Sequence, residues 1–520
     1  MTPARRRTAW AATIGVVSAG ALLAAAELVA VLLARNASVL LAIGAFVIDV
    51  VPRPLKELAI TTLGTADKPV LLVGVAVAAG VAAALAGVLE VRRPGWGAAA
   101  FVVGAALATA AAVTRAGTGA LAWVPPVVGG AVGVGVLVLL ARLLRRADAP
   151  EPADPPTDAS PGIARRSFLR ATAIASVSAV LVGAGAAAAR LGSSAVGAVR
   201  EALRLPAPRS RVAVPGAAQL DIPGLSPLIT SNADFYRVDT ALSVPRVDPS
   251  TWRLTIDGLV ERPVELGFDE LVAMGLDEYA ITLTCVSNEV GGDLVDTAIW
   301  LGVPVREVLR LAGPRAGADM VLSRSVDGFT ASTPLASLTD DGLDAILAVG
   351  MNGEPLPLEH GFPVRMVVPG LYGYVSATKW LTELRVTTFA DDEAYWTPRG
   401  YSATAPIKLS SRVDTPKLGA AVAAGRVPIA GVAWAQTVGI ARVEVRIDDG
   451  DWQDATLAEA LADDTWVQWV LEWDAEPGTH YLTVRATDRA GTLQTEEPAP
   501  IAPDGSTGWQ RTLVTVTEAG

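Results

Sequence analysis

The 520-residue sequence contains one cysteine, Cys285, and only two histidines, His360 and His480. A single thiol cannot form an internal disulfide, and it cannot supply the several cysteines of a structural zinc site or an iron–sulfur cluster. Cys285 is therefore either a buried inert thiol or one thiolate bonded to a soft or electrophilic group. Because no histidine precedes residue 360, the apolar N-terminal part cannot hold a haem between two histidines.

Charge is also scarce, since charged residues make up 18% of the chain and hydrophobic residues 51%. The mean hydropathy of +0.41 is too high for a wholly soluble protein. The stretch 10–34 carries only Glu27 as a charge and is long enough to cross a bilayer core of roughly 30 Å. Further candidate spans are residues 69–89, 98–113 and 121–144. The shorter stretch 39–51 fits an interfacial segment at least as well as a span.

Clusters of arginine precede the first candidate span, follow the second and close the fourth. Four spans before residue 147 would place all these clusters on the cytoplasmic side. The sequence therefore predicts a transmembrane helical domain over residues 1–146. Its few acidic residues, Glu27 and Asp49, either mark a functional site or make polar contacts between helices.

Residues 147–163 are rich in proline, aspartate and alanine, which predicts a disordered linker. Residues 164–192 then combine Arg165 and Arg166 with a weakly apolar run, a pattern typical of a twin-arginine export signal. The alternative is the basic flank of one more helix. Twin-arginine export carries folded protein, so we expect the export machinery as a partner and an uncleaved anchor. The predicted location is the cell membrane, multi-pass, with the residues from about 200 onward on the extracytoplasmic side.

Residues 205–395 have the composition of a soluble α+β domain. Residues 251–258 and 279–284 alternate apolar and polar side chains, which predicts strands, and the second of these ends at Cys285. Residues 268–274 favour a short helix, and another helix is expected to begin near Pro304. Cys285 is thereby expected at a strand end, where a rigid scaffold meets an open loop.

A second polar cluster combines His360, Arg365 and Lys379 with the hydroxyl groups of Ser376 and Thr378. Guanidinium and ammonium groups together bind phosphate, the first with forked hydrogen bonds and the second as a point charge. The cluster predicts an anion cradle. The alternative is a surface arginine and a lysine at a helix end.

Five blocks in fixed order resemble the sulfite oxidase family of molybdopterin-dependent oxidoreductases: Leu283-Thr284-Cys285 with Asn288, Trp300-x-Gly302-Val303-Pro304-x-Arg306, Met351-Asn352-Gly353-Glu354-Pro355-Leu356-Pro357, His360-Gly361-Phe362-Pro363-Val364-Arg365, and Lys379-Trp380. The resemblance implies an α+β fold around one molybdenum–molybdopterin and oxygen-atom transfer at the metal. It assigns Cys285 as the metal ligand, which suits a soft, sulfur-rich site. It assigns cofactor binding to Asn232, Tyr236, Arg237, Cys285, Ser325, His360, Arg365, Ser376, Thr378 and Lys379.

The departures from the family pattern concern the substrate. Sulfite-oxidising members have arginines after the ligand cysteine, where this chain has Glu289 and Val290, and a tyrosine where it has Val349. A glutamate in a desolvated pocket would repel sulfite. Arg237 remains a possible anion contact and is assigned with Cys285 to catalysis. We expect a neutral small-molecule substrate such as a sulfoxide, an N-oxide or an organic sulfur compound; the alternative is a sulfite dehydrogenase.

The sequence has no haem-attachment motif and no cysteine cluster, so an external electron carrier or a quinone is the expected redox partner. Short strand-like runs over residues 400–520 predict an immunoglobulin-like sandwich. By resemblance this is a dimerisation domain, which makes a homodimer possible, and His480 is expected to be a packing residue. No nucleic-acid partner is expected. A non-catalytic, envelope-tethered binding or assembly module is the alternative of another class.

Overall fold

The computed structural model describes residues 3–33, 38–51, 67–114, 121–147, 162–191 and 194–518. Two compact units divide the chain, Met1–Ala195 and Val196–Gly520. The predicted linker 147–163 lies almost wholly outside the described residues. Each unit is therefore considered by itself.

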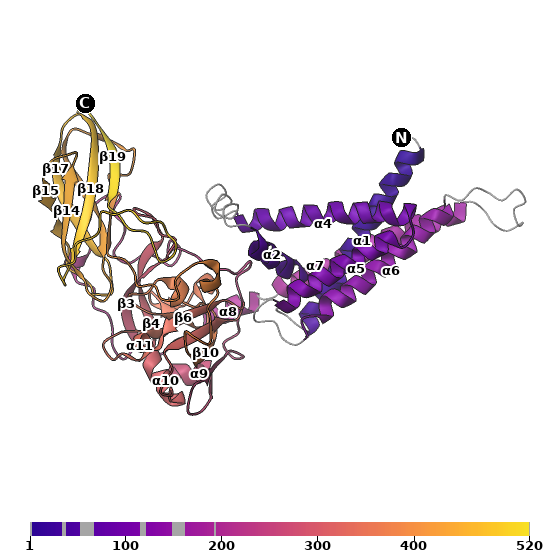
Figure 1. The fold of residues 1–520 in the computed structure, drawn as a ribbon, viewed down its shortest axis with the longest axis horizontal. Helices are drawn as coiled ribbons and strands as arrows, with labels where there is room; N and C mark the ends of the chain where they lie inside the picture. Colours follow the sequence, from indigo (N-terminus) through magenta and orange to yellow (C-terminus); the bar gives the residue numbers. More distant parts are fainter. Residues whose placement is uncertain are drawn as a thin grey trace, which may run out of the picture. The chain divides into compact units, whose positions relative to one another are not determined.

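Most described residues of the first unit are helical. Its helices are α1 (Pro3–Leu33), α2 (Val39–Val50), α4 (Asp67–Arg92), α5 (Trp96–Thr114), α6 (Val124–Ala147) and α7 (Gly162–Leu191). Helix α1 packs on α4, α6 and α7, and α5 packs on α6 (Figure 1). Gly15 of α1 makes the contact with α4 possible, because a Cβ there would lie 1.9 Å from the Ala83 carbonyl oxygen. Small residues let apolar helices approach this closely.

Four helical segments in the described ranges are long and apolar enough to span a bilayer: Ala4–Leu33, Val73–Arg92, Trp96–Thr114 and Val124–Ala147. Their number agrees with the four spans predicted before residue 147. Helix α2 has 12 residues, too short for a full crossing of about 20 residues. The crossing of a membrane and its orientation stay predictions.

The first part of the second unit contains helix α8 (Ser194–Ala202), the short helix η2 (Gly216–Ala218) and two sheets, one mixed and one antiparallel. One sheet has the strand order β2-β1-β10-β5-β6, with β1 (Arg253–Gly258), β2 (Val264–Gly267), β5 (Met320–Ser325), β6 (Thr330–Pro334) and β10 (Leu381–Thr387). The other has the order β3-β4-β7-β8, with β9 also pairing with β7. Its strands are β3 (Asp277–Thr284), β4 (Val295–Pro304), β7 (Ile346–Met351), β8 (Glu354–Pro355) and β9 (Arg365–Val367).

Short helices connect these strands: α9 (Phe268–Ala273), α10 (Val305–Ala312), α11 (Leu335–Thr339), η3 (Leu358–His360) and η4 (Gly373–Val375); η5 (Thr397–Arg399) follows the last of them, β10. The helix predicted near Pro304 is confirmed, since α10 begins directly after that residue. It ends at Gly313, whose φ of +68° favours glycine. The α+β character predicted for this region is confirmed.

The C-terminal part of the second unit consists of β strands. These are β11 (Ser410–Thr415), β12 (Ala421–Ala423), β13 (Gly425–Trp434), β14 (Ile440–Ile447), β15 (Trp452–Asp454), β16 (Thr456–Leu457), β17 (Val467–Ala475), β18 (Gly478–Asp488) and β19 (Gln510–Thr517). They form two sheets, β11-β13-β17-β16 and β12-β19-β18-β14-β15, around a shared apolar core that includes Trp469 and Val484 (Figure 1, orange to yellow). The immunoglobulin-like assignment and dimerisation stay predictions. His480 contacts the Trp473 ring at 5.2 Å between centroids.

The C-terminal part also holds strand β3, which leads to Cys285. Thr282 of β3 is fully buried, and its hydroxyl accepts a hydrogen bond of 2.8 Å from the Trp466 backbone N–H. The Gln436 side-chain amide donates to the Thr284 hydroxyl at 3.3 Å. The position of Cys285 therefore depends on contacts with residues far along the chain.

Candidate active site

Cys285 directly follows strand β3 and is 8% exposed. Its backbone N–H donates to the Leu294 carbonyl at 2.9 Å, and its carbonyl accepts from the Asn288 N–H at 3.0 Å. Burial raises the pKa of the Cys285 thiol, while the Ser287 backbone N–H, 3.4 Å from Sγ, and the charge of Lys379 favour the thiolate. The thiol sits in a closed loop with a donor already directed at its sulfur.

Two buried cations lie against one turn of the chain. Arg365 of β9 is 3% exposed and donates from Nη1 to the His360 carbonyl at 3.2 Å. Lys379 is 9% exposed and donates from Nζ to the Glu359 carbonyl at 3.0 Å. Burial lowers the pKa of Arg365 to about 10 and that of Lys379 to about 8. Both remain protonated at neutral pH, so two positive charges are held out of water.

Two buried nitrogen atoms beside this turn lack a hydrogen-bond partner among the described residues: Nε of Arg365 and Nδ1 of His360. Burying a polar atom without a partner is costly, above all on a charged group. Arg365 also lines a pocket, so its unpaired atom indicates that an anionic or acceptor-rich ligand belongs there.

The Lys379 ammonium has an acidic partner, Asp239. Asp239 Oδ2 lies 3.1 Å from Lys379 Nζ and 2.9 Å from Arg237 Nε. The Asp239 side chain is 6% exposed, whereas that of Arg237 is 40% exposed. One buried carboxylate oxygen therefore serves two cations.

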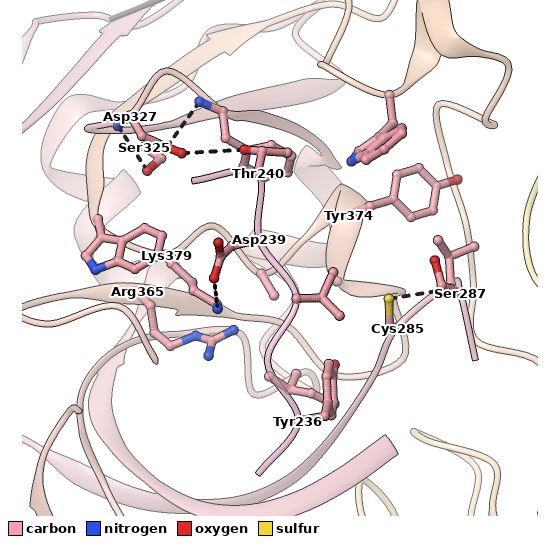
Figure 2. A pocket seen from close by; sticks show the side chains of 18 of the residues that line it. Tyr236, Asp239, Thr240, Cys285, Ser287, Ser325, Asp327, Arg365, Tyr374 and Lys379 are labelled. Atoms are coloured by element: carbon pink, nitrogen blue, oxygen red, sulfur yellow. Dashed lines mark hydrogen bonds and ion pairs between the residues drawn. The ribbon is translucent and has the colours of Figure 1, made fainter. Parts of the chain in front are cut away.

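A single cavity joins the thiol to the two buried cations. It contains about 910 Å³ of empty space, part of it open to solvent. Figure 2 shows Cys285, Ser287 and Tyr374 on one side, and Arg365 and Lys379 with Asp239 on the other.

The pocket brings together some of the predicted site residues. Its lining includes Tyr236, Cys285, Ser325, Arg365 and Lys379. The other predicted residues do not line it: Asn232, Arg237, His360, Ser376 and Thr378. The roles assigned to both groups stay predictions.

The residues outside the lining make supporting contacts. His360 donates from Nε2 to the Asn232 carbonyl at 3.0 Å, and its ring packs against Phe235. Burial, together with the charges of Lys379 and Arg365, lowers the pKa of His360 to about 4. Asn232 also accepts from the Asn352 side chain at 2.9 Å. These residues hold the pocket wall from behind.

The hydroxyl groups of Ser376 and Thr378, predicted to belong to the anion cradle, also make hydrogen bonds within the protein. Ser376 Oγ donates to the Leu371 and Tyr372 carbonyls at 3.1 and 3.0 Å. The Thr378 hydroxyl bonds to that of Ser323 at 2.7 Å.

Several lining residues were not predicted from the sequence. Three are polar and lie at the end with the cations, namely Asp239, Thr240 and Asp327. The others of note are aromatic: Phe329, Tyr374, Trp396 and Tyr401. Only Tyr374 carried a signal, because it stands between the quoted His360 and Lys379 blocks; Asp239 and Trp396 lie outside every motif.

The residues expected to govern substrate charge lie elsewhere. Glu289 is exposed and Val349 is fully buried in the core, and neither lines the pocket. The expected repulsion of sulfite by Glu289 inside the pocket is therefore not a feature of this structure.

Comparison with known proteins places this pocket in a known class of enzymes. Residues 241–396 match the family model of the oxidoreductase molybdopterin binding domain. Mitochondrial sulfite oxidase of Mus musculus is 31% identical in an alignment of length 321 that covers 52% of this chain and 58% of that protein. Sulfite oxidase of Gallus gallus is 30% identical in an alignment of length 323 that covers 52% of this chain and 69% of that protein.

Two further similarities accompany these. Nitrate reductase [NAD(P)H] of Hordeum vulgare is 34% identical in a shorter alignment of length 179 that covers 30% of this chain and 20% of that protein. The crystal structure of the sulfane dehydrogenase SoxCD from Paracoccus pantotrophus superposes with a TM-score of 0.48 at 22% identity, covering 56% of this chain and 85% of that one.

The chain is thus a molybdopterin-dependent oxidoreductase. More narrowly, it belongs to the sulfite oxidase family, although it spans only 58% of the length of the mouse relative. The predicted family, enzyme class and molybdopterin cofactor are confirmed.

The residues present fit that cofactor. A lone thiolate suits a soft metal, and two buried cations, one with an unpaired Nε, suit a phosphate. Both the thiol and the two cations lie on the cavity wall.

Proposed function

We propose that this protein is a membrane-anchored oxidoreductase that catalyses oxygen-atom transfer at one molybdenum–pterin, with Cys285 as the protein's ligand to the metal. The observation that carries the proposal is the shared cavity of the Cys285 thiol with Arg365 and Lys379, inside the region that matches the family. When bound, the cofactor supplies two-electron redox chemistry at the metal.

The chain's own residues would prepare the site for this cofactor. Cys285 must lose its proton to bind a metal, and the Ser287 N–H and the Lys379 charge favour that loss. Arg365 and Lys379 would hold the phosphate, since their positions are set by the carbonyls of the 359–360 turn. Tyr236 and Ser325 would contact the pterin from the cavity wall.

The wall near Cys285 supports a neutral substrate. Tyr374, Tyr401 and Trp396 form a series of rings whose centroids are 5.5 and 5.2 Å apart. A Cβ at neighbouring Gly373 would lie 3.9 Å from the Thr284 carbonyl, which places this wall beside the Cys285 strand end. Aromatic faces suit apolar and sulfur-bearing groups rather than oxyanions.

The distribution of charge supports the same substrate class. The only cations among the described lining residues are Arg365 and Lys379, and both are assigned to the cofactor. Arg237, the predicted anion contact, is paired with Asp239 and lies outside the lining. A sulfoxide, an N-oxide or an organic sulfur compound fits this wall, while identity with sulfite oxidases favours a sulfite dehydrogenase as the second candidate.

The helical unit and the arginine pair support anchoring and export. Outward-facing Val73, Val77 and Leu85 are 63%, 61% and 65% exposed, a surface that lipid would cover. Arg165 and Arg166 lie in the first turns of α7, consistent with an uncleaved signal anchor on the twin-arginine route. The catalytic unit would then face the extracytoplasmic side and pass electrons to an external carrier or a quinone.

Metal analysis tests the proposal. The full chain is purified in detergent from cells that make the cofactor. It should contain about one molybdenum atom per chain, because Cys285 is the proposed protein ligand of a single metal. Cys285→Ala should lose the Mo–S bond seen by X-ray absorption, together with activity, whereas Ser287→Ala should keep the metal. Wild-type protein without molybdenum would reject the enzymatic function and favour the non-catalytic module.

Two assays on the same preparation separate the substrate classes. Reduction of a sulfoxide by a reduced viologen dye is expected, and sulfite-driven reduction of ferricyanide is not. Turnover of sulfite alone would replace the neutral-substrate proposal with a sulfite dehydrogenase.

A further inference from the structure

The carboxylate of Asp239 stands in the cationic part of the pocket. Its Oδ2 atom accepts from Lys379 Nζ at 3.1 Å and from Arg237 Nε at 2.9 Å. Figure 2 shows the Asp239 side chain directed at Lys379, within the cavity. The carboxylate is 6% exposed, so this charge is held in a largely desolvated environment.

A negative charge here opposes what a phosphate site requires. Phosphate binding gains from uncompensated positive charge and from unpaired donors. Asp239 neutralises the Lys379 ammonium and would repel a second anion at close range. Among the pocket's cations, only Arg365 keeps a buried donor atom without a partner.

We propose that Asp239 is the counterion of Lys379 until the pterin cofactor binds. Its negative charge keeps small inorganic anions out of the cofactor's phosphate site, and Lys379 exchanges Asp239 for the phosphate when the cofactor enters. This inference rests on the proposed function of the pocket. A cofactor that also contacts the rest of the cavity can compete with Asp239, whereas a free phosphate or sulfate has only the cations to bind.

The exchange of Asp239 for a phosphate at Lys379 costs little free energy, because both residues keep another partner. When Lys379 turns to a phosphate, Asp239 keeps its hydrogen bond of 2.9 Å to Arg237. Lys379 in turn keeps the Glu359 carbonyl, 3.0 Å from Nζ. Neither the acid nor the ammonium is left buried without a partner, which is the costly outcome for a charged group.

Asp239 also favours the protonated form of Lys379 while the site waits for its cofactor. Burial lowers the pKa of Lys379 to about 8, and the nearby carboxylate counteracts part of that effect. The same residue can therefore preserve the charge of the cradle and exclude competing anions.

Binding of sulfate to the full chain tests the proposal. The protein is produced in cells that cannot make the cofactor, purified in detergent and titrated with sulfate by calorimetry at pH 6, where sulfate is a dianion and Lys379 is protonated. Wild type should bind sulfate weakly. Asp239→Asn should bind it at least about tenfold more tightly, equivalent to about 1.4 kcal/mol.

The matched control is Asp234→Asn, which removes an exposed acid of the same segment whose carboxylate accepts from Ser231. It should bind sulfate like wild type. In the double variant Asp239→Asn/Lys379→Met the gain should disappear, because it depends on the released ammonium.

Equal sulfate affinity of wild type and Asp239→Asn, whether weak or tight, would overturn the proposal. Tighter sulfate binding that persists in the double variant with Lys379→Met would overturn it as well. If the asparagine variant does not fold, Asp239→Ser takes its place. Molybdenum content is measured in parallel on chains from cofactor-producing cells: its absence from wild type contradicts the proposed function, while the sulfate result concerns Asp239 alone.

Discussion

Gly361 controls how closely the two buried cations approach each other. Its φ of +112° favours glycine, and a Cβ there would lie 3.0 Å from the Arg365 Cβ and 3.1 Å from the Lys379 Cβ. A larger residue would separate the stems of the two side chains. The glycine in the His360–Arg365 block is therefore explained by the spacing of the cations, and not only by the turn.

The neighbouring residue, His360, predicts a pH dependence of stability. Its pKa falls from 6.5 unfolded to about 4 folded, so it stays neutral in the native state. Between these values the unfolded chain binds a proton that the folded chain does not. His360 therefore makes the protein less stable as pH falls from 6.5 to 4, by up to about 3 kcal/mol.

Denaturant unfolding of the cofactor-free chain at pH 7 and pH 4.5 measures this effect. His360→Gln should lose less stability on acidification than wild type. His480→Gln is the opposite control, since the hydrogen bond to Asp448 raises the pKa of His480 and its contribution is present at low pH and lost as pH rises. An unchanged acid sensitivity in His360→Gln would contradict the expectation.

At the scale of elements, strand β3 carries Cys285 only because other segments hold it in register. The Thr282 hydroxyl contacts the Thr297 hydroxyl on strand β4 and accepts from the Trp466 backbone N–H. All three residues are buried. The strand end that presents the thiol is therefore fixed from two sides.

Thr282→Val should destabilise the second unit by about 1–3 kcal/mol, because the buried Trp466 N–H loses its acceptor. It should also lower the molybdenum content, since Cys285 follows three residues later. Denaturant unfolding and metal analysis measure the two effects. Thr404→Val makes the same change at an exposed loop residue and should alter neither stability nor molybdenum content. Equal stability of the two variants would show that the hydrogen bond between Thr282 and Trp466 does not stabilise the fold.

The sequence predicts the strands and helices around the site better than it predicts which residues line the pocket. Strand β3 and helix α10 follow from local alternation and from Pro304, so both were expected. Asp239 and Trp396 reach the pocket through tertiary packing, which leaves no periodic signal. For the same reason Glu289, adjacent to the cysteine loop in sequence, was expected inside the pocket but is exposed outside it.

At the scale of the whole molecule, the described pocket residues all belong to the unit Val196–Gly520. A chain lacking residues 2–147, with Arg165 and Arg166 retained, should therefore load as much molybdenum as the full chain. Metal analysis of the two purified proteins checks this, and an otherwise identical chain with Cys285→Ala gives the background. Loss of metal on truncation would mean that the N-terminal helices take part in loading.

The Trp466 indole donates to the Leu228 carbonyl at 2.8 Å. Around it lies a small apolar core built from four separate stretches of chain: Ala218, Leu228, Val295, Val432, Trp434 and Trp466. A nascent chain that has emerged only to residue 400 lacks half of these side chains, and strand β3 lacks the hydrogen bond between Thr282 and Trp466. We therefore expect metal insertion to wait until synthesis is finished and this core has closed.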